Sequence, residues 1–217
     1  MWLTLRMSRD CHRHTTMLDR YGAALIKPVV DAVGRQLARV GVTANQLTVS
    51  GFLIGLIAAF LIASGAYLAG AMAILISRSC DALDGAVARG NAPTDRGGFL
   101  DIALDFLFYA SIPLAFAVAD PTRNALAAAT LLAAFVGTAS SFLAFAVMAA
   151  KRGMHSTAYP DKSFYFLGGL AEATETLALF IATCVWPQHF SVLAYAFSAA
   201  CVITIATRIW WGWRALG

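Results

Sequence analysis

Four aspartates in one short stretch are the residues of this chain best suited to chemistry. They form two pairs, Asp81 with Asp84 and Asp101 with Asp105, and Asp95 lies in the segment between the pairs. Residues three or four positions apart share one face of a helix, so the carboxylates of each pair project together. If the two helices are antiparallel neighbours joined by the short intervening segment, all four carboxylates converge. Such a concentration of like charge requires a counter-charge.

Two kinds of counter-charge are available. One is a network of ion pairs with Arg78, Arg89 and Arg96. Three arginines are too few to neutralise four acids, and Arg96 is expected in the loop. The other is a divalent cation, because hard oxygen ligands suit Mg²⁺, Mn²⁺ or Ca²⁺. We therefore expect a metal site formed by the four aspartates.

The elements that hold these acids are predicted to be membrane helices. Hydrophobic residues make up 59% of the chain and charged residues 13%, against about 25% in an ordinary soluble domain. No Asp, Glu, Lys or Arg occurs in residues 40–77, 124–150 or 176–207. Since a membrane span needs roughly 20 apolar residues, these runs hold several spans. The composition excludes a soluble globular protein and a disordered one, and acids within such segments indicate a functional site.

The sequence predicts an all-α membrane protein with six transmembrane helices. They are expected at about residues 45–64, 68–89, 97–118, 124–150, 163–186 and 191–211. Basic residues gather before the first span, between the second and third, between the fourth and fifth, and after the sixth. By the positive-inside rule both termini and the acidic motif face the cytoplasm. The net charge of +4 follows from this asymmetry, so no nucleic-acid partner is expected.

An amphipathic helix is predicted before the first span, at about residues 18–40. Its apolar residues recur at helical spacing, and Pro28 is expected to kink or divide it. We interpret it as a helix lying in the cytoplasmic membrane interface, which is compatible with a cap packed on the bundle. Residues 1–16 lack this pattern and are expected to be a disordered tail or to precede the true start, with Met1 and Met17 as the alternatives. Residues 17–214 are expected to form one membrane domain.

The acidic motif resembles the signature of a known enzyme family. Asp81-Ala-Leu-Asp84-Gly85-Ala-Val-Ala88-Arg89, followed by Gly97-Gly-Phe-Leu-Asp101-Ile-Ala-Leu-Asp105, is similar to the pattern DxxDGxxAR…GxxxDxxxD of the class I CDP-alcohol phosphotransferases, or CDP-alcohol phosphatidyltransferases. The spacer is slightly shorter than the family pattern, which affects the shape of the loop. The resemblance covers about residues 17–214 and is greatest to an uncharacterised bacterial inner-membrane branch, so it names no acceptor.

The resemblance implies a role for each motif residue. Asp81, Asp84 and Asp101 would hold two divalent cations, Mg²⁺ or Mn²⁺. Asp105 would be a further metal neighbour and the general base that takes a proton from an acceptor alcohol. That alcohol would attack the β-phosphorus of a CDP-alcohol, with CDP-diacylglycerol the expected donor, and CMP would leave. The residues implied to border CDP are Asp81, Asp84, Gly85, Ala88, Arg89 and Gly97, with Asn45 and Thr48 as further candidates. The resemblance also favours a homodimer.

The acceptor pocket has two interpretations that the sequence leaves open. Glu172 and Glu175 either bond neighbouring helices or line a pocket for a cationic or polyhydroxyl acceptor. Basic residues either anchor the chain at the cytoplasmic face or form a pocket for a phosphorylated alcohol; they are Lys151, Arg152, Lys162 and Arg208.

Two functions from other classes are alternatives to an enzyme of phospholipid biosynthesis in the bacterial inner membrane. A divalent-cation transporter also places aspartates in membrane helices, but transporter sites tend to lie near the bilayer midplane on broken helices. Here the acids fall at the cytoplasmic helix ends. A catalytically silent, lipid-binding member of the family is the second alternative, and the intact Asp105 argues against it.

Overall fold

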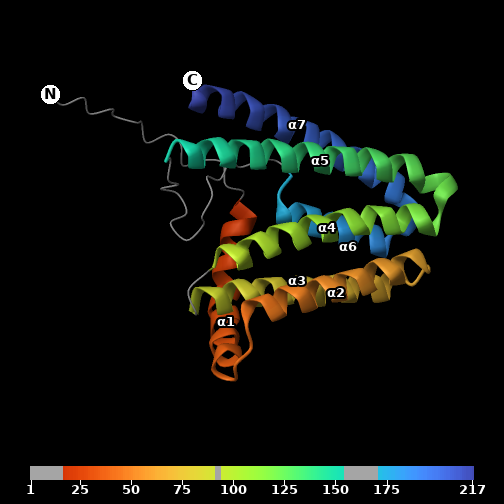
Figure 1. Ribbon diagram of the computed structural model, residues 1–217. Helices are drawn as coiled ribbons and strands as arrows, with labels where there is room; N and C mark the ends of the chain where they lie inside the picture. The colour runs from red at the N-terminus through yellow and green to blue at the C-terminus, as the bar shows by residue number, and fades with distance from the viewer. Residues whose placement is uncertain (1–16, 91–93, 154–170) are drawn as a thin grey trace.

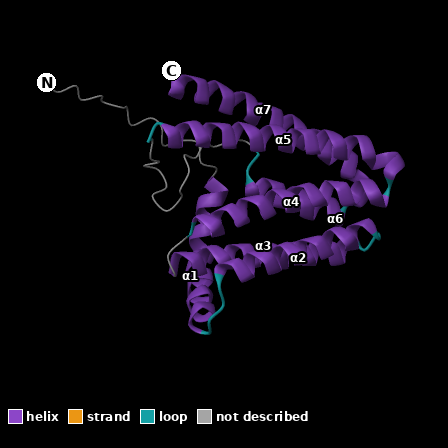
Figure 2. Ribbon diagram, in the orientation of Figure 1, coloured by secondary structure: helices purple, strands orange, loops and turns teal. Residues whose placement is uncertain are grey.

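The structure is a computed structural model, and it describes residues 17–90, 94–153 and 171–217. All regular secondary structure in these ranges is helical (Figure 2). The elements are α1 (Met17–Arg39), α2 (Ala44–Ala63), α3 (Tyr67–Gly90), α4 (Asp95–Ala119), α5 (Pro121–Lys151), α6 (Ala173–Val185), the short 3₁₀ helix η2 (Pro187–His189) and α7 (Phe190–Leu216). The all-α prediction is confirmed for the described part of the chain. The expectations for residues 1–16 lie outside it.

The helices form a bundle with one crossing helix at its end (Figure 1). Helices α2 to α7 run roughly along one direction, and α1 lies across the end where α3 finishes and α4 begins. Helix α2 packs on α3 and α4, α5 packs on α4 and α7, and α1 and α6 both pack on α3. The two motif-bearing helices, α3 and α4, are therefore central, and their motif ends lie beside α1.

Local sequence signals explain the hairpin of α2 and α3. Thr43 and Gln46 form a capping box that starts α2, with Gln46 Oε1 accepting from the Thr43 amide at 2.9 Å. Gly65 has φ of 84° in the turn that follows, a conformation that L residues with side chains rarely adopt. A Cβ added at Gly55 would lie 2.5 Å from Phe108 Cδ2, so glycine is what lets α2 approach α4.

Aromatic packing fixes α4 against the C-terminal helices. The rings of Phe116 and Phe190 stack with centroids 4.5 Å apart, and Phe108 meets Phe180 edge-on at 6.3 Å. All four side chains are buried. Since such rings lose much packing energy when displaced, this layer holds α4 in a defined register relative to α6 and α7.

The outer surface of the bundle is suited to lipid. Within the described ranges, four helical segments are long and apolar enough to cross a membrane: Ala44–Ala63, Asp95–Ala119, Pro121–Lys151 and Pro187–Leu216. Large apolar side chains point outward along them, including Phe60 at 72% and Leu126 at 73% exposure. Helix α3 falls outside this set because it carries the motif charges, and α6 because it has 13 residues. The protein is a multi-pass membrane protein, and the count of six spans stays a prediction.

The predicted fifth span, residues 163–186, differs from the structure. Residues 163–170 lie outside the described ranges, and helix α6 begins only at Ala173. The Glu172 amide donates to Glu175 Oε2 at 3.2 Å, and the Ala171 amide donates to Thr204 Oγ1 at 3.0 Å. These side chains satisfy amides that a continuous helix would have bonded internally, so the prediction of an unbroken span was wrong at this point.

The amphipathic helix is confirmed as Met17–Arg39, and it stays helical through Pro28 instead of dividing there. Val29 and Val33 are 64% and 42% exposed. Gly34 is buried against α3, where an added Cβ would lie 2.6 Å from Ala86 Cβ. Helix α1 therefore packs on the bundle and also presents apolar side chains outward, as an interfacial helix does.

Candidate active site

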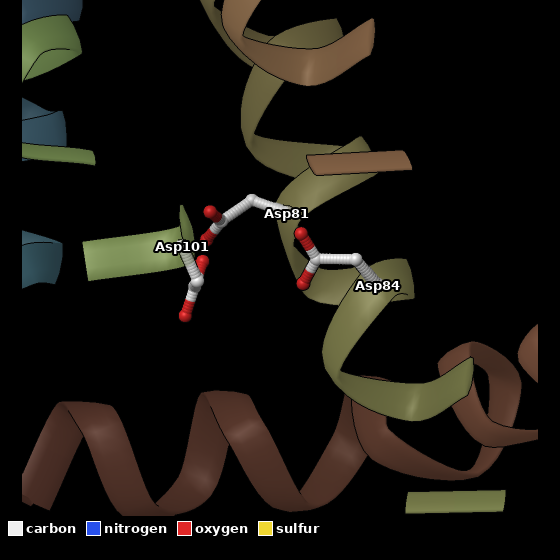
Figure 3. A group of neighbouring side chains, drawn as sticks. All are labelled: Asp81, Asp84 and Asp101. Atoms are coloured by element: carbon white, nitrogen blue, oxygen red, sulfur yellow. The ribbon is translucent and has the colours of Figure 1, made fainter. Parts of the chain in front are cut away.

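Three carboxylates converge between α3 and α4. Asp81 and Asp84 come from α3 and Asp101 from α4, and Figure 3 shows their carboxyl groups turned toward a common space. Each offers a ligand oxygen, and these oxygens all lie within 4.8 Å of one another. The start of α4 is fixed by Thr94, whose Oγ1 accepts from the Gly97 amide at 3.1 Å. The predicted convergence is confirmed for these three residues.

Asp84 is the most enclosed of the acids. Asp84 is 6% exposed, and its Oδ2 accepts a hydrogen bond of 2.6 Å from the Thr48 hydroxyl. Thr48 was expected to border the nucleotide. The structure places it on α2 as the direct partner of Asp84, where it orients this carboxylate toward the space shared with Asp81 and Asp101.

Asp105 is held differently from the other three acids. Its Oδ1 accepts a hydrogen bond from Arg78 Nη1, and the same nitrogen lies 3.5 Å from Asp81 Oδ1. Asp105 is not part of the group of converging ligand oxygens found among the described residues. From the sequence, Arg78 was considered only as one partner in a network of ion pairs. Arg78 precedes Asp81 by three residues on the same helix face, and this spacing was the signal for its contact with Asp81.

The other two arginines of that predicted network do not join the carboxylates. Arg89 Nη2 pairs with Asp31 Oδ1 of α1 at 3.0 Å, and Arg96 is exposed in the first turn of α4. One guanidinium against four carboxylates leaves an excess of negative charge. Three close carboxylate oxygens with excess negative charge fit a hard divalent cation, so Asp81, Asp84 and Asp101 have the chemistry of a Mg²⁺ or Mn²⁺ site.

Of the residues expected to border the nucleotide, Gly85, Ala88 and Arg89 follow Asp84 on α3, and Gly97 precedes Asp101 on α4. A Cβ at Gly97 would be 3.1 Å from Asn45 Oδ1, which brings the start of α2 against the start of α4. A Cβ at Gly85 would be 3.3 Å from Arg89 Nη1. Ala88 is half-buried on the same helix. Sequence reasoning missed Asp31, because its pairing with Arg89 joins residues that are far apart in the chain.

The candidate acceptor residues have different surroundings in the structure. Glu175 caps α6 through the Glu172 amide, while Lys151 and Arg152 are exposed at the end of α5. Arg208 Nη1 donates to the Thr138 carbonyl at 3.2 Å and lies near enough to Glu172 for a favourable electrostatic interaction. Lys162 lies outside the described residues. A structural role is therefore visible for Glu175, and the acceptor pocket stays a prediction.

The Thr48–Asp84 hydrogen bond gives a testable consequence. In Thr48→Val the side chain keeps its shape but leaves Asp84 without its donor, so the carboxylate loses its fixed orientation. Removing the partner of a metal ligand typically costs 10–100-fold in affinity, and we expect Mn²⁺ binding about tenfold weaker by titration calorimetry.

Thr130→Val is the matched control for this change. Its hydroxyl bonds only within α5, to the Leu126 carbonyl at 2.8 Å, so Mn²⁺ affinity should be unchanged. Equal affinities for Thr48→Val and the wild type would show that the hydrogen bond does not position Asp84.

Comparison with known proteins agrees with the site. Residues 41–210 match the model of a protein family described as CDP-alcohol phosphatidyltransferase. The inner membrane protein YnjF of Escherichia coli is 50% identical over 200 residues, which is 92% of this chain and 97% of that protein. An archaetidylinositol phosphate synthase of Pyrococcus horikoshii is 34% identical over 112 residues, 51% of this chain and 60% of that protein.

Solved structures share the fold. The phosphatidylinositol phosphate synthase PgsA1 of Mycobacterium tuberculosis with CDP-DAG bound has a TM-score of 0.64 at 23% identity, covering 86% of this chain and 94% of that one. The same enzyme in complex with manganese and citrate has a TM-score of 0.67 at 24% identity, covering 85% and 88%. At these identities the likeness concerns the fold alone. The match over most of the chain, together with the carboxylate geometry, shows that this protein belongs to the CDP-alcohol phosphatidyltransferase family.

Proposed function

We propose that this protein transfers a phosphatidyl or related substituted phosphoryl group from a CDP-alcohol to an alcohol acceptor and releases CMP. CDP-diacylglycerol is the proposed donor, and the proposed role is phospholipid biosynthesis. The observation that carries the proposal is the convergence of Asp81, Asp84 and Asp101 beside a separately held Asp105. Family membership supports it, and so does the CDP-DAG bound to the structurally similar synthase.

Asp105 has the geometry of the proposed base. Arg78 occupies its Oδ1, which leaves Oδ2 to accept a proton from the acceptor hydroxyl. The hydroxyl oxygen then bonds to the β-phosphorus, and the bond between that phosphorus and the bridging oxygen of CMP breaks. The proton passes from Asp105 to water, and CMP carries away the negative charge of the broken bond. The carboxylate acts mainly through its position.

Several side chains of the site would help to offset the negative charge of the pyrophosphate. Asp81, Asp84 and Asp101 would hold two divalent cations, Mg²⁺ or Mn²⁺, which would stabilise the negative charge of the leaving CMP. Gly85, Gly97 and Ala88 offer little bulk beside these acids. Arg89 would present its guanidinium to a phosphate, either after its contact with Asp31 breaks or while that contact persists.

The position of the site at the helix ends supports one proposed membrane topology. We propose six spans with both termini and the active site on the cytoplasmic face of the bacterial inner membrane, and one domain at residues 17–214. Helix α3 would cross as the antiparallel partner of α2, since the turn between them is very short. A cytoplasmic site among membrane helices suits an amphiphilic donor and a water-soluble acceptor. A homodimer is also proposed, on the family resemblance.

The acceptor can be identified with purified protein in detergent. Labelled CDP-diacylglycerol and Mg²⁺ or Mn²⁺ would be offered with glycerol 3-phosphate, inositol 1-phosphate, inositol, serine, choline or glycerol. Metal-dependent CMP release with one acceptor would establish the reaction and name its product. Absence of both CMP release and CDP binding across the panel would contradict the proposal.

Glu172 distinguishes the two interpretations of the acceptor pocket. If its carboxylate lines the pocket, Glu172→Gln keeps the side-chain shape and changes the acceptor profile, with about tenfold lower kcat/KM for a favoured cationic or polyhydroxyl alcohol. The profile is read from CMP release across the panel. Glu175→Gln is the control, because glutamine also completes a capping box. An unchanged profile with a lower melting temperature in Glu172→Gln would assign Glu172 a structural role instead.

A further inference from the structure

The ion pair between Asp31 and Arg89 joins the crossing helix α1 to the last turn of α3. Arg89 Nη2 lies 3.0 Å from Asp31 Oδ1, although the two residues are 58 positions apart in the chain. Their side chains are 48% exposed for Arg89 and 28% exposed for Asp31. An ion pair this accessible to water contributes little to stability. Its main effect is therefore on the position of the Arg89 guanidinium.

The Arg89 guanidinium reaches back toward the acidic cluster. A Cβ added at Gly85 would lie 3.3 Å from Arg89 Nη1, so this nitrogen lies beside the residue that follows Asp84. The other terminal nitrogen, Nη2, bonds to Asp31. A guanidinium carries several N–H donors in a fixed fork, so one carboxylate leaves donors for a second anion. The contact with Asp31 thus holds the Nη1 donors next to a proposed metal ligand.

A close contact between α1 and α3 fixes the place of Asp31. Gly34 follows Asp31 by three positions, so the two residues share one face of α1. Gly34 is buried, and a Cβ added there would lie 2.6 Å from Ala86 Cβ and 3.3 Å from the Ala86 carbonyl carbon. Helices packed this closely have little freedom to shift. Helix α1 therefore presents the Asp31 carboxylate at one place along α3.

Asp31 would affect phosphate binding in one of two opposite ways. As a competitor it would draw Arg89 away from the phosphates, and a nucleotide would bind more tightly without it. As a positioning residue it would hold the guanidinium in place, and a nucleotide would bind less tightly without it. The geometry favours positioning, because Asp31 engages Nη2 while Nη1 lies at Gly85. An arginine released from this contact has to be ordered again when the ligand binds, which costs affinity.

We propose that Asp31 is a positioning residue that holds Arg89 toward the pyrophosphate of a CDP-alcohol, with the ion pair intact while the nucleotide is bound. Helix α1 then takes part in nucleotide binding, and bound nucleotide ties α1 more firmly to α3 through Arg89. This inference rests on the proposed function for the identity of the ligand. Asp31 itself touches neither the substrate nor the metal.

Asp31→Asn should raise the KM for the CDP-alcohol about tenfold and weaken CDP binding equally, with kcat near that of the wild type. The lost negative charge would by itself favour an anionic nucleotide, so weaker binding has to come from lost positioning. Mn²⁺ affinity and melting temperature should stay unchanged, because the converging carboxylates keep their contacts and the ion pair is partly exposed. Asp31→Glu keeps the charge and should recover most of the affinity.

The test is a calorimetric titration of the full-length protein in detergent with CDP in the presence of Mn²⁺. Asp95→Asn is the control, because it makes the same chemical change at an exposed acid in the first turn of α4. Arg89→Gln is combined with Asp31→Asn in a double-mutant cycle. If Asp31 acts through Arg89, Asp31→Asn should have little effect on CDP affinity in the Arg89→Gln background.

Hydrogen exchange of the wild type gives a second measurement that needs no variant. Bound CDP should slow the exchange of backbone amides in residues 28–39 of α1, because Arg89 then joins α1 to the ligand. Unchanged exchange in this segment with CDP bound would overturn the link between α1 and the nucleotide.

The cycle separates this inference from the proposed function. Unchanged CDP affinity in Asp31→Asn would overturn the positioning role, and tighter binding would make Asp31 a competitor instead. An equal loss of affinity in both backgrounds would also overturn it, because Asp31 would then act without Arg89. If the wild type binds CDP but releases no CMP, the proposed reaction fails while the cycle still tests Asp31. Absence of CDP binding in the wild type would contradict both.

Discussion

Asp105→Asn is expected to reduce metal-dependent CMP release by about 10²–10⁴-fold, the range that a positioned general base contributes. The amide has almost the shape of the carboxylate, and its oxygen can still accept a hydrogen bond from Arg78. It cannot take a proton from the acceptor hydroxyl. Binding of CDP and of Mn²⁺ should survive, because the three converging carboxylates are unchanged. The measurement is kcat beside the binding affinity for CDP.

The control for this variant is Asp120→Asn, the same chemical change at the other end of the bundle. Asp120 caps α5 by accepting from the Arg123 amide at 3.1 Å, and asparagine is an equally good N-cap. Activity and stability should therefore match those of the wild type. Wild-type turnover in Asp105→Asn would remove Asp105 as the base and with it the chemical step proposed above.

Asp84→Ala is expected to lose metal binding and activity together. Asp84 is the most buried of the converging acids, and its Oδ2 is held by the Thr48 hydroxyl. Loss of this ligand should weaken Mn²⁺ binding so far that the same Mn²⁺ concentration no longer stabilises the fold. In the wild type, Mn²⁺ at about 100 times its dissociation constant stabilises the protein by about 2.7 kcal/mol, so melting curves report binding directly. The variant should show no such shift and no CMP release.

Stability without metal separates metal loss from misfolding. Asp84→Ala removes one of several crowded like charges, so in chelator its melting temperature should be no lower than that of the wild type. Asp95→Ala is the control, because Asp95 is an exposed acid in the first turn of α4. Magnesium-dependent activity retained in Asp84→Ala would break the assignment of the metal site.

The location of the acidic site could be predicted because it depends on local spacing. Two residues on one helix face, repeated on the next helix, define a cluster once those helices are neighbours, and Asp81, Asp84 and Asp101 meet as expected. The short connection between α3 and α4 made that neighbourhood a safe inference. The same spacing places Arg78 on the face of Asp81, but from the sequence Arg78 was considered only as one partner in an alternative network of ion pairs.

The contacts that tune the site could not be predicted, because they join distant parts of the chain. Thr48 reaches Asp84 across the α2–α3 hairpin, and Asp31 reaches Arg89 from the crossing helix α1. Each depends on the angle and register at which two helices pack, and those are set by features such as the close approach of Gly55 to Phe108. Sequence periodicity gives the face of a helix but not its partner.

Hydrophobicity also has a limit in predicting the spans. Residues 163–186 were predicted as one helix because they are mostly apolar, yet the described helix starts at Ala173. Glu175 and Thr204 bond the backbone at that start, and a polar cap inside an apolar stretch is not visible in average hydrophobicity. Conversely, α3 carries the motif charges and is not among the described segments that are apolar enough to cross a membrane, although residues 68–89 were predicted as the second span. That span stays a prediction.

We propose that the carboxylate cluster serves group transfer and not the passage of a cation. Proteoliposomes containing the wild-type protein and CDP-diacylglycerol would receive Mn²⁺ and the acceptor found in the panel, and CMP release and Mn²⁺ accumulation would be followed together. The expected result is metal-dependent CMP release that Asp105→Asn abolishes, with Mn²⁺ staying outside sealed vesicles. Accumulation of Mn²⁺ inside the vesicles without CMP release would contradict the enzyme and favour a divalent-cation transporter.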